Sequence, residues 1–240
     1  MIILNYEEHI GNLERNGFKR FANTRDLVLF AQNEKNKGEN DENIKAKIVE
    51  FCEKNGVENM SWLDKKRLNE IISLANKDRR ELAERIGFSE QELSKIGTLQ
   101  DYNAQKLLFL MATICKTYRI DSIYLNSNSP IKMKELLQMA YVNISAKKGE
   151  MLLREMYEKG LISVKPNLKC TLTFLETGDF QPKFDMKPTV SAVDFYNVYK
   201  GVGIFCSECG KFVRKRSNNT KYCAECAKII KHKPIKCSES

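Results

Sequence analysis

Little in this sequence supports catalysis. There are two histidines, His9 and His232, and neither has a partner at a spacing typical of a catalytic site. The 240 residues contain no GxxxxGK(S/T) phosphate loop, no GxGxxG turn after a strand, no HExxH zinc motif and no GxSxG elbow. Tyrosine and serine are common, but the clustered arginines and histidines that activate a recombinase nucleophile are missing. We therefore expect that the protein is not an enzyme.

Long apolar runs are also missing. The longest, at residues 107–115, is too short to span a bilayer. The first residues have a brief apolar start followed by acidic side chains, which is not the pattern of a secretory signal. Cys52, Cys115 and Cys170 lie in apolar contexts typical of reduced core positions. We expect a cytoplasmic protein, in a bacterial cell or a phage-infected host, with no membrane partner.

Four further cysteines form the most informative pattern in the chain. Cys206 with Cys209 and Cys223 with Cys226 make two CxxC pairs near the C-terminus. Such pairs supply four thiolates for a tetrahedral Zn²⁺, and with no open coordination position the ion is structural. Four unrelated reduced cysteines, or two disulfides, are the alternatives. The duplicated spacing favours one structural zinc ion.

The net charge of +9 is concentrated toward the C-terminal half. Residues 1–62 carry nine basic and eleven acidic side chains, whereas residues 131–175 carry eight and four. Residues 206–236 carry nine basic and two acidic side chains. A solvated, lysine-rich surface explains part of this gradient. Its focus on small modules indicates an anionic polymer as the partner.

Residues 79–98 have the pattern of a helix-turn-helix. Ala83 falls where two helices would meet, Gly87 lies in the turn, and Ser89 with Glu92 forms a capping box for the second helix. With the apolar-faced helix that follows, residues 63–125 resemble the repressor-like (Xre-type) helical domain. The resemblance implies a mainly helical fold whose second motif helix enters the major groove.

On that second helix, Gln91 and Lys95 are the candidate DNA contacts, and Gln91 suits adenine. Glu90 and Glu92 would repel phosphates, and Lys95 alone offsets them. A helical bundle of the same geometry that binds protein, or nothing, is the alternative.

Residues 131–176 predict a second unit. A helix over residues 133–142 precedes one that Ser145 caps and Gly160 ends, and two alternating strands follow. This order resembles a winged helix-turn-helix with a hairpin wing. The resemblance implies DNA contacts from the second helix and from the wing, at Lys147, Lys148, Arg154, Lys165 and Lys169. A winged helix used for oligomerisation or docking is the alternative.

The cysteine module is also basic. Its candidate phosphate contacts are Arg214, Lys215, Arg216 and Lys221. A hairpin around the first CxxC pair and a helix after the second resemble a treble-clef or zinc-ribbon finger, as found on phage and mobile-element proteins. Zinc binding and folding would then be coupled. A finger that docks on a protein such as a recombinase or polymerase is the alternative.

These interpretations predict a mainly α protein of several small parts. They are an N-terminal helical segment (1–60), a repressor-like helix-turn-helix domain (61–126), a winged helix (130–177), a linker (178–202) and a four-cysteine zinc finger (203–236). We expect a regulatory protein that binds double-stranded DNA, as a monomer or a homodimer, in the manner of a phage or mobile-element transcriptional regulator.

A non-enzymatic accessory factor is the second hypothesis. It would dock on a DNA enzyme, as a recombination directionality factor for a phage integrase or as a replication adaptor, and the acidic N-terminal segment favours it. RNA binding is weaker, because Phe212 and Tyr222 are the only evident aromatic platforms.

Overall fold

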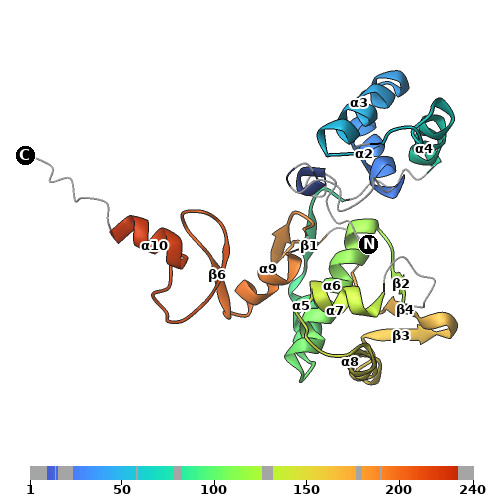
Figure 1. Cartoon of the computed structure of the whole chain (residues 1–240). Coiled ribbons are helices and arrows are strands. Elements are labelled where there is room, and N and C mark those ends of the chain that lie inside the picture. Colours follow the sequence, from blue (N-terminus) through green and yellow to red (C-terminus); the bar gives the residue numbers. More distant parts are fainter. Residues whose placement is uncertain are drawn as a thin grey trace, which may run out of the picture. The chain divides into compact units, whose positions relative to one another are not determined.

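The computed structural model describes residues 10–13, 15, 24–57, 59–77, 83–125, 132–176, 180–189 and 191–231. These residues are mostly helical, with three small sheets (Figure 1). Contacts divide the chain into two compact units. The first consists of Met1–Ile86, Ile114–Ile120 and Lys187–Val190, and the second of Gly87–Thr113, Asp121–Met186 and Ser191–Ser240. The expectation of a mainly helical protein is confirmed.

Among the described residues, the helices α2 (Thr24–Asn36), α3 (Asp41–Lys54) and α4 (Lys65–Lys77) make up most of the first unit, which also includes the last residues of α6. The Asn40 side chain caps α3 by accepting a hydrogen bond of 2.9 Å from the Asn43 amide. Their apolar faces pack together around the stacked rings of Phe30 and Phe51, 4.4 Å apart. The buried residues of this core include Leu27, Ala31, Ile44, Ile48, Cys52, Ile71 and Ala75.

The core of the second unit surrounds residues 102–113 of α6 (Tyr102–Tyr118), a helix that is apolar on nearly every side and correspondingly buried. Phe109 on this helix stacks on Phe88 at 4.5 Å and on Tyr196 of α9 (Ala192–Tyr199) at 4.8 Å. The helix α5 (Glu90–Gly97) begins with the predicted capping box. There Ser89 Oγ accepts from the Glu92 amide at 3.1 Å, and the Glu92 carboxylate accepts from the Ser89 amide at 3.0 Å.

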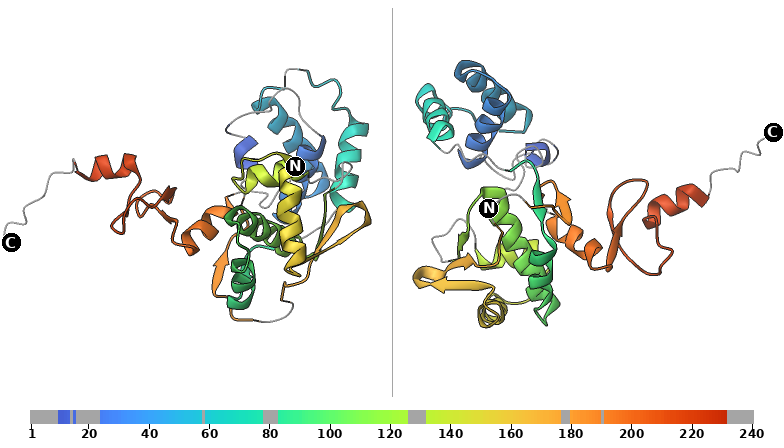
Figure 2. Two further views of the ribbon diagram at one scale, coloured as in Figure 1. Left: turned by 90° about the horizontal axis from the view of Figure 1, so that it is seen from below. Right: turned by 180° about the vertical axis from the view of Figure 1, so that it is seen from behind.

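A helical pair and a three-stranded sheet follow α6. The helices are α7 (Met133–Met139) and α8 (Ala146–Glu158), and the antiparallel sheet has the order β2 (Ser122–Tyr124), β4 (Lys169–Leu172), β3 (Ile162–Lys165). A short 3₁₀ turn (Pro166–Leu168) joins β3 to β4. Gly149 lets α8 approach α7 closely, because a Cβ there would lie 2.9 Å from a Leu137 methyl group. The helix α8 lies beside β3 (Figures 1 and 2).

The pattern of residues 79–98 predicts a helix-turn-helix, but the prediction of its first helix is wrong for the residues that the structure describes. Residues 83–85 are irregular, and Ile86–Phe88 is the strand β1, which pairs with β5 (Phe184–Met186). Gly87 is needed in this strand because Pro182 lies 2.8 Å from where its Cβ would stand. Residues 79–82 lie outside the described part of the chain.

Two predicted boundaries also differ from the structure. The expected linker at residues 178–202 contains β5 and α9, and Tyr196 of α9 is fully buried. The expected domain at residues 61–126 is divided, since α4 packs on α2 and α3 in the first unit while α5 belongs to the second. The cysteine module, by contrast, has the predicted hairpin and helix: β6 (Gly203–Phe205), β7 (Phe212–Arg214) and α10 (Ala224–Lys231).

Candidate metal centre and basic surfaces

The β6–β7 hairpin holds the first cysteine pair in a tight turn. The Cys206 amide donates to the Lys211 carbonyl at 2.8 Å, and the Gly210 amide donates to the Cys206 carbonyl at 2.9 Å. Gly210 has φ of 70°, a conformation that glycine adopts without strain. The second pair enters α10, where the Ala227 amide donates to the Cys223 carbonyl at 2.9 Å. Sequence-local turns therefore bring both pairs to one point.

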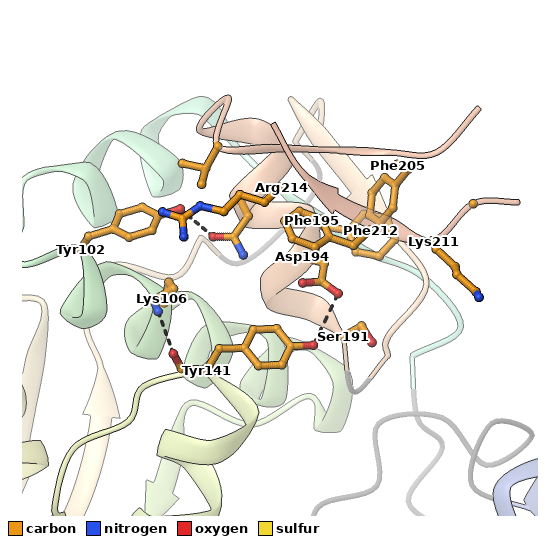
Figure 3. A pocket seen from close by; sticks show the side chains of 13 residues that line it. Tyr102, Lys106, Tyr141, Ser191, Asp194, Phe195, Phe205, Lys211, Phe212 and Arg214 are labelled. Atoms are coloured by element: carbon orange, nitrogen blue, oxygen red, sulfur yellow. Dashed lines mark hydrogen bonds between the residues drawn. The ribbon is translucent and has the colours of Figure 1, made fainter. Parts of the chain in front are cut away.

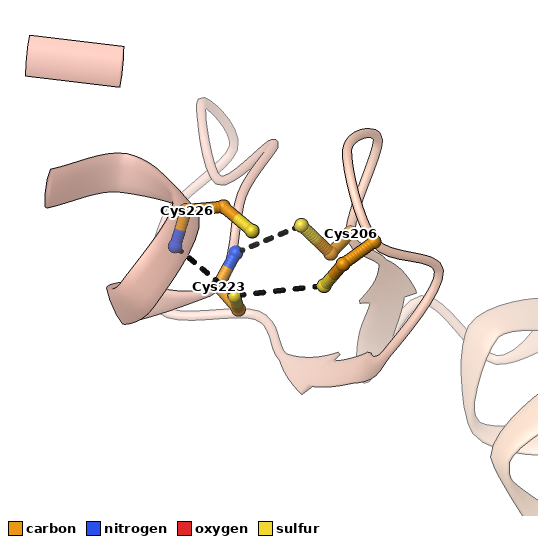
Figure 4. A group of neighbouring side chains, drawn as sticks. Cys206, Cys223 and Cys226 are labelled. Atoms are coloured by element: carbon orange, nitrogen blue, oxygen red, sulfur yellow. Dashed lines mark hydrogen bonds between the residues drawn. The ribbon is translucent and has the colours of Figure 1, made fainter. Parts of the chain in front are cut away.

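The four thiols converge there (Figure 4). Their Sγ atoms all lie within 4.8 Å of one another. The Sγ atoms of Cys209 and Cys223 are 3.8 Å apart, close to the ~3.8 Å edge of a tetrahedron with zinc–sulfur bonds of about 2.3 Å. The described cysteines form no disulfide. The predicted ligand set Cys206, Cys209, Cys223 and Cys226 is therefore brought together in a geometry that can hold a metal ion.

Backbone amides surround these sulfur atoms. The Cys223 amide donates to Cys206 Sγ at 3.2 Å, and the Cys226 amide donates to Cys223 Sγ at 3.4 Å (Figure 4). Hydrogen bonds from the Cys223 and Cys209 amides lower the pKa of Cys206 to about 6. Hydrogen bonding to the sulfur atoms of Cys223 and Cys209 raises the pKa of Cys226. Four thiols this close do not all ionise by themselves, and a bound divalent cation would supply the missing counter-charge.

The predicted contacts on α8 lie on its surface. Ser145 caps the helix by accepting from the Lys148 amide at 3.3 Å. Lys147 and Lys148 follow in the first turn, and both are exposed. Arg154 is also exposed, but its guanidinium donates to the Glu158 carboxylate at 2.7 Å. The two lysines are therefore the unpaired cations of this helix surface among the described residues.

The two wing lysines face each other across the hairpin. Lys165 of β3 is paired with Lys169 of β4 in the register, and Lys169 lies 5.6 Å from the Tyr124 ring centroid. Like charges placed opposite each other destabilise a hairpin. A hydrogen bond from Ser122 lowers the pKa of the Asp121 carboxyl group, and the nearby Lys169 and Lys165 lower it further. This one carboxylate therefore offsets part of the charge of the two lysines.

The α5 residues are less suited to DNA. Gln91 and Lys95 are exposed, as predicted. Glu90 is exposed and lies 3.9 Å from Lys183. Glu92 is fully buried and accepts a second amide hydrogen bond, from Glu176 at 2.9 Å. Its carboxylate joins the start of α5 to the backbone at Glu176 and does not face a partner.

The finger residues Arg214, Lys215, Arg216 and Lys221 are all exposed. Across the described part of the chain, none of them forms an ion pair with a carboxylate. Lys211, in contrast, lies 3.3 Å from Glu225. Four solvated cations thus surround a module that has few acidic groups to neutralise them.

The second unit also contains a cavity of about 890 Å³ that no sequence pattern predicts (Figure 3). Its walls come from α6, from α9 and from the finger hairpin, and they include Tyr102, Lys106, Asp194 and Arg214. These residues are up to about a hundred positions apart. No local spacing connects them, although the aromatic run at residues 195–199 is a signal that this segment is not a linker.

Comparison with known proteins gives no relative. No protein-family model, no curated protein and no solved structure matches the chain. Among the described residues, no helix combines the length and the apolar character needed to cross a bilayer.

Proposed function

We propose that the protein binds double-stranded DNA in a regulatory role, through a winged helix formed by residues 102–172 and a zinc finger formed by residues 203–231. The order helix, strand, helix, helix, strand, strand with sheet order β2-β4-β3 supports a winged helix. In this arrangement α6 is the first helix and β2 the first strand, which extends the predicted domain of residues 130–177 toward the N-terminus. The helix α8 is then the recognition helix and the β3–β4 hairpin the wing.

The charge on these two elements is the observation that carries the proposal. Lys147 and Lys148 are exposed at the start of α8, and Lys165 lies opposite Lys169 in the adjacent hairpin. Phosphates would relieve the repulsion in the hairpin and neutralise the helix. Phosphate contacts of this kind position a protein on the duplex, and base contacts add specificity. The exposed α5 residues Gln91 and Lys95 are secondary candidates.

The test is a fluorescence anisotropy titration with a labelled duplex. The double variant Lys147→Gln/Lys148→Gln should bind about tenfold more weakly, the scale of one or two charge-assisted hydrogen bonds. The control is Lys65→Gln/Lys66→Gln, which removes the same charge from exposed positions at the start of α4. Equal losses in the two variants, or no affinity of the unmodified protein for duplex DNA, would contradict the proposal.

We infer that the metal ion is one structural zinc ion. Four thiolates are a soft donor set that suits zinc, and four ligands leave no open position for a substrate. Metal analysis of the purified protein should give one zinc equivalent. Cys223→Ser should lose it and unfold the finger, whereas Cys52→Ala, which changes a buried cysteine of the first unit, should keep it. Full zinc retention by Cys223→Ser would refute the ligand assignment.

A docking role on a DNA enzyme is the second candidate, and exposed apolar side chains on α8 favour it. Met151 is 69% and Tyr157 57% exposed. A recombinase or polymerase that bound the protein would cover such side chains, as would a second copy of the chain. If Met151→Ser/Tyr157→Ser abolishes binding to such an enzyme in gel filtration while duplex affinity is absent throughout, docking replaces DNA binding as the function.

A further inference from the structure

The cavity of the second unit has charged groups in its walls that the protein itself leaves without ion pairs. Lys106 of α6 is 8% exposed, and its ammonium group donates to the Tyr141 carbonyl at 3.0 Å. It also lies 5.7 Å from the Tyr102 ring centroid. Within the described residues no carboxylate forms an ion pair with it. Burial lowers the pKa of Lys106, although Asp101 acts in the opposite direction. Burial of an unpaired cation is costly, so an anion that entered the cavity would be stabilised.

A second buried charge lies across the cavity. Asp194 of α9 is also 8% exposed, and it accepts a hydrogen bond of 3.4 Å from the Tyr141 hydroxyl. Burial raises the pKa of its carboxyl group, and the Tyr141 hydrogen bond lowers it by less. The cavity therefore offers a hydrogen-bond acceptor at a position separate from its cation. A ligand with an anionic group and a separate donor group matches this arrangement.

The remaining walls are aromatic. Phe195 of α9 packs against Phe205 of the finger hairpin, with ring centroids 4.6 Å apart, and Phe212 lies 6.3 Å from Phe205. In Figure 3 these three rings lie on one side of the view and Tyr102 on the other, with Asp194 directly below the rings. These rings are inclined to one another by 56° and 75°, and the individual ring faces accept a planar ring system by stacking.

Arg214 supplies a further cation at the rim. Its side chain is exposed and extends toward Tyr102 in Figure 3. It forms no ion pair within the described residues, whereas Lys211, which also lines the cavity, is already paired with Glu225. Lys106 and Arg214 thus leave an uncompensated positive charge next to the aromatic walls.

We propose that this cavity binds a nucleotide, with the phosphate between Lys106 and Arg214, the base against the aromatic walls, and Asp194 accepting a hydrogen bond from the base. Its volume of about 890 Å³ lies within the usual range for small-molecule sites. The nucleotide is either a free effector or an unpaired nucleotide of a strand, since both present a base and a phosphate. The site does not depend on the proposed duplex binding, because Lys147 and Lys148 do not line the cavity.

The experiment is isothermal titration calorimetry of the zinc-loaded full chain. The ligands are the mono- and triphosphates of the four nucleosides and a single-stranded oligonucleotide. Arg214→Gln, an exposed position, should weaken binding about tenfold, the scale of a lost charge-assisted contact. Lys106→Met should do the same. Arg216→Gln, which removes an exposed cation two residues further along that does not line the cavity, should leave binding unchanged.

Each outcome decides one point. Binding of free nucleotides that both cavity variants weaken supports an effector site, and binding of the oligonucleotide alone with the same sensitivity supports capture of a strand. Absence of binding at millimolar concentration, or equal affinity in all variants, overturns the proposal. Benzoate binding as tightly as any nucleotide would overturn the ligand class. Lys147→Gln/Lys148→Gln should leave nucleotide binding intact, so failure here and failure of the duplex proposal are separate results.

Discussion

Gly203 is the single residue on which the geometry of the finger hairpin depends most directly. The Phe212 ring on the paired strand occupies the place where a Cβ of residue 203 would stand. The ring in turn covers the backbone of β6 and reaches Phe205. Even one methyl group at this position would therefore displace the aromatic cluster that joins the hairpin to α9.

Gly203→Ala should consequently destabilise the β6–β7 hairpin by about 1–3 kcal/mol, the usual cost of overpacking. Amide hydrogen exchange of the hairpin in the zinc-loaded protein measures this directly, as faster exchange at Ile204 and Val213. Gly97→Ala is the control, because nothing lies within 4 Å of a Cβ there and the change should be neutral or slightly stabilising. Unchanged exchange in Gly203→Ala would show that the Phe212 ring moves aside freely.

Glu34 is a second residue whose substitution tests the structure. Its side chain is 7% exposed and accepts hydrogen bonds from Lys37 at 2.7 Å and Lys47 at 2.6 Å. Burial acts to raise the pKa of its carboxyl group, but the two lysines outweigh burial and hold the pKa below its ordinary 4.5. Because the folded pKa is the lower one, its contribution to stability is present above about pH 4.5 and is lost as the pH falls through the folded pKa.

Glu34→Gln should therefore reduce the unfolding free energy of the first unit by about 1–3 kcal/mol at pH 7 and reduce its loss below pH 4.5. Trp62, the only tryptophan, lies in this unit, so its fluorescence reports urea unfolding. Glu53→Gln, an exposed position on α3, should change the free energy by less than about 0.5 kcal/mol. Equal pH profiles of the protein and Glu34→Gln would contradict the assignment.

At the scale of elements, local side chains determine where a helix begins. The N-cap serines of α5 and α8 allow this to be tested. Ser89 caps α5 reciprocally with the buried Glu92, whereas Ser145 caps α8 on the surface. Ser89→Ala should cost about 1–2 kcal/mol and Ser145→Ala less, since its bond is longer and solvated. Hydrogen exchange at the Glu92 and Lys148 amides measures both. An equal or larger cost at Ser145 would contradict this ranking.

The same locality explains what sequence reasoning could predict. Four predicted features each depend on residues within a single short segment of their own. They are the capping box at Ser89, the start of α8 at Ser145, the wing hairpin and the convergence of the four thiols. The strand β1 pairs with β5, about a hundred residues away, and Ile86 follows Leu82 at a spacing that also fits a helix. The strand β2 likewise depends on a distant partner, because it pairs with β4. The cavity depends on α6, α9 and the finger together, so no local pattern indicates it.

At the scale of the whole molecule, positive charge is segregated along the chain. Residues 1–62 are slightly acidic, while residues 206–236 carry nine basic and two acidic side chains. Attraction to phosphates should therefore come from the second unit, to which α8, the wing and the finger all belong. If both the winged helix and the finger contact one duplex, their contributions to counterion release add.

This additivity gives a prediction for the salt dependence of duplex binding. The slope of log affinity against log salt is negative, and each lost phosphate contact should reduce its magnitude by about 0.9. Lys147→Gln/Lys148→Gln and Lys215→Gln/Arg216→Gln should each reduce this magnitude by about 1.8, and the combined variant by about 3.6. Anisotropy titrations between about 50 and 200 mM salt measure this slope. If the finger docks on a protein, Lys215→Gln/Arg216→Gln will leave the slope unchanged, while Lys147→Gln/Lys148→Gln on α8 will still reduce its magnitude.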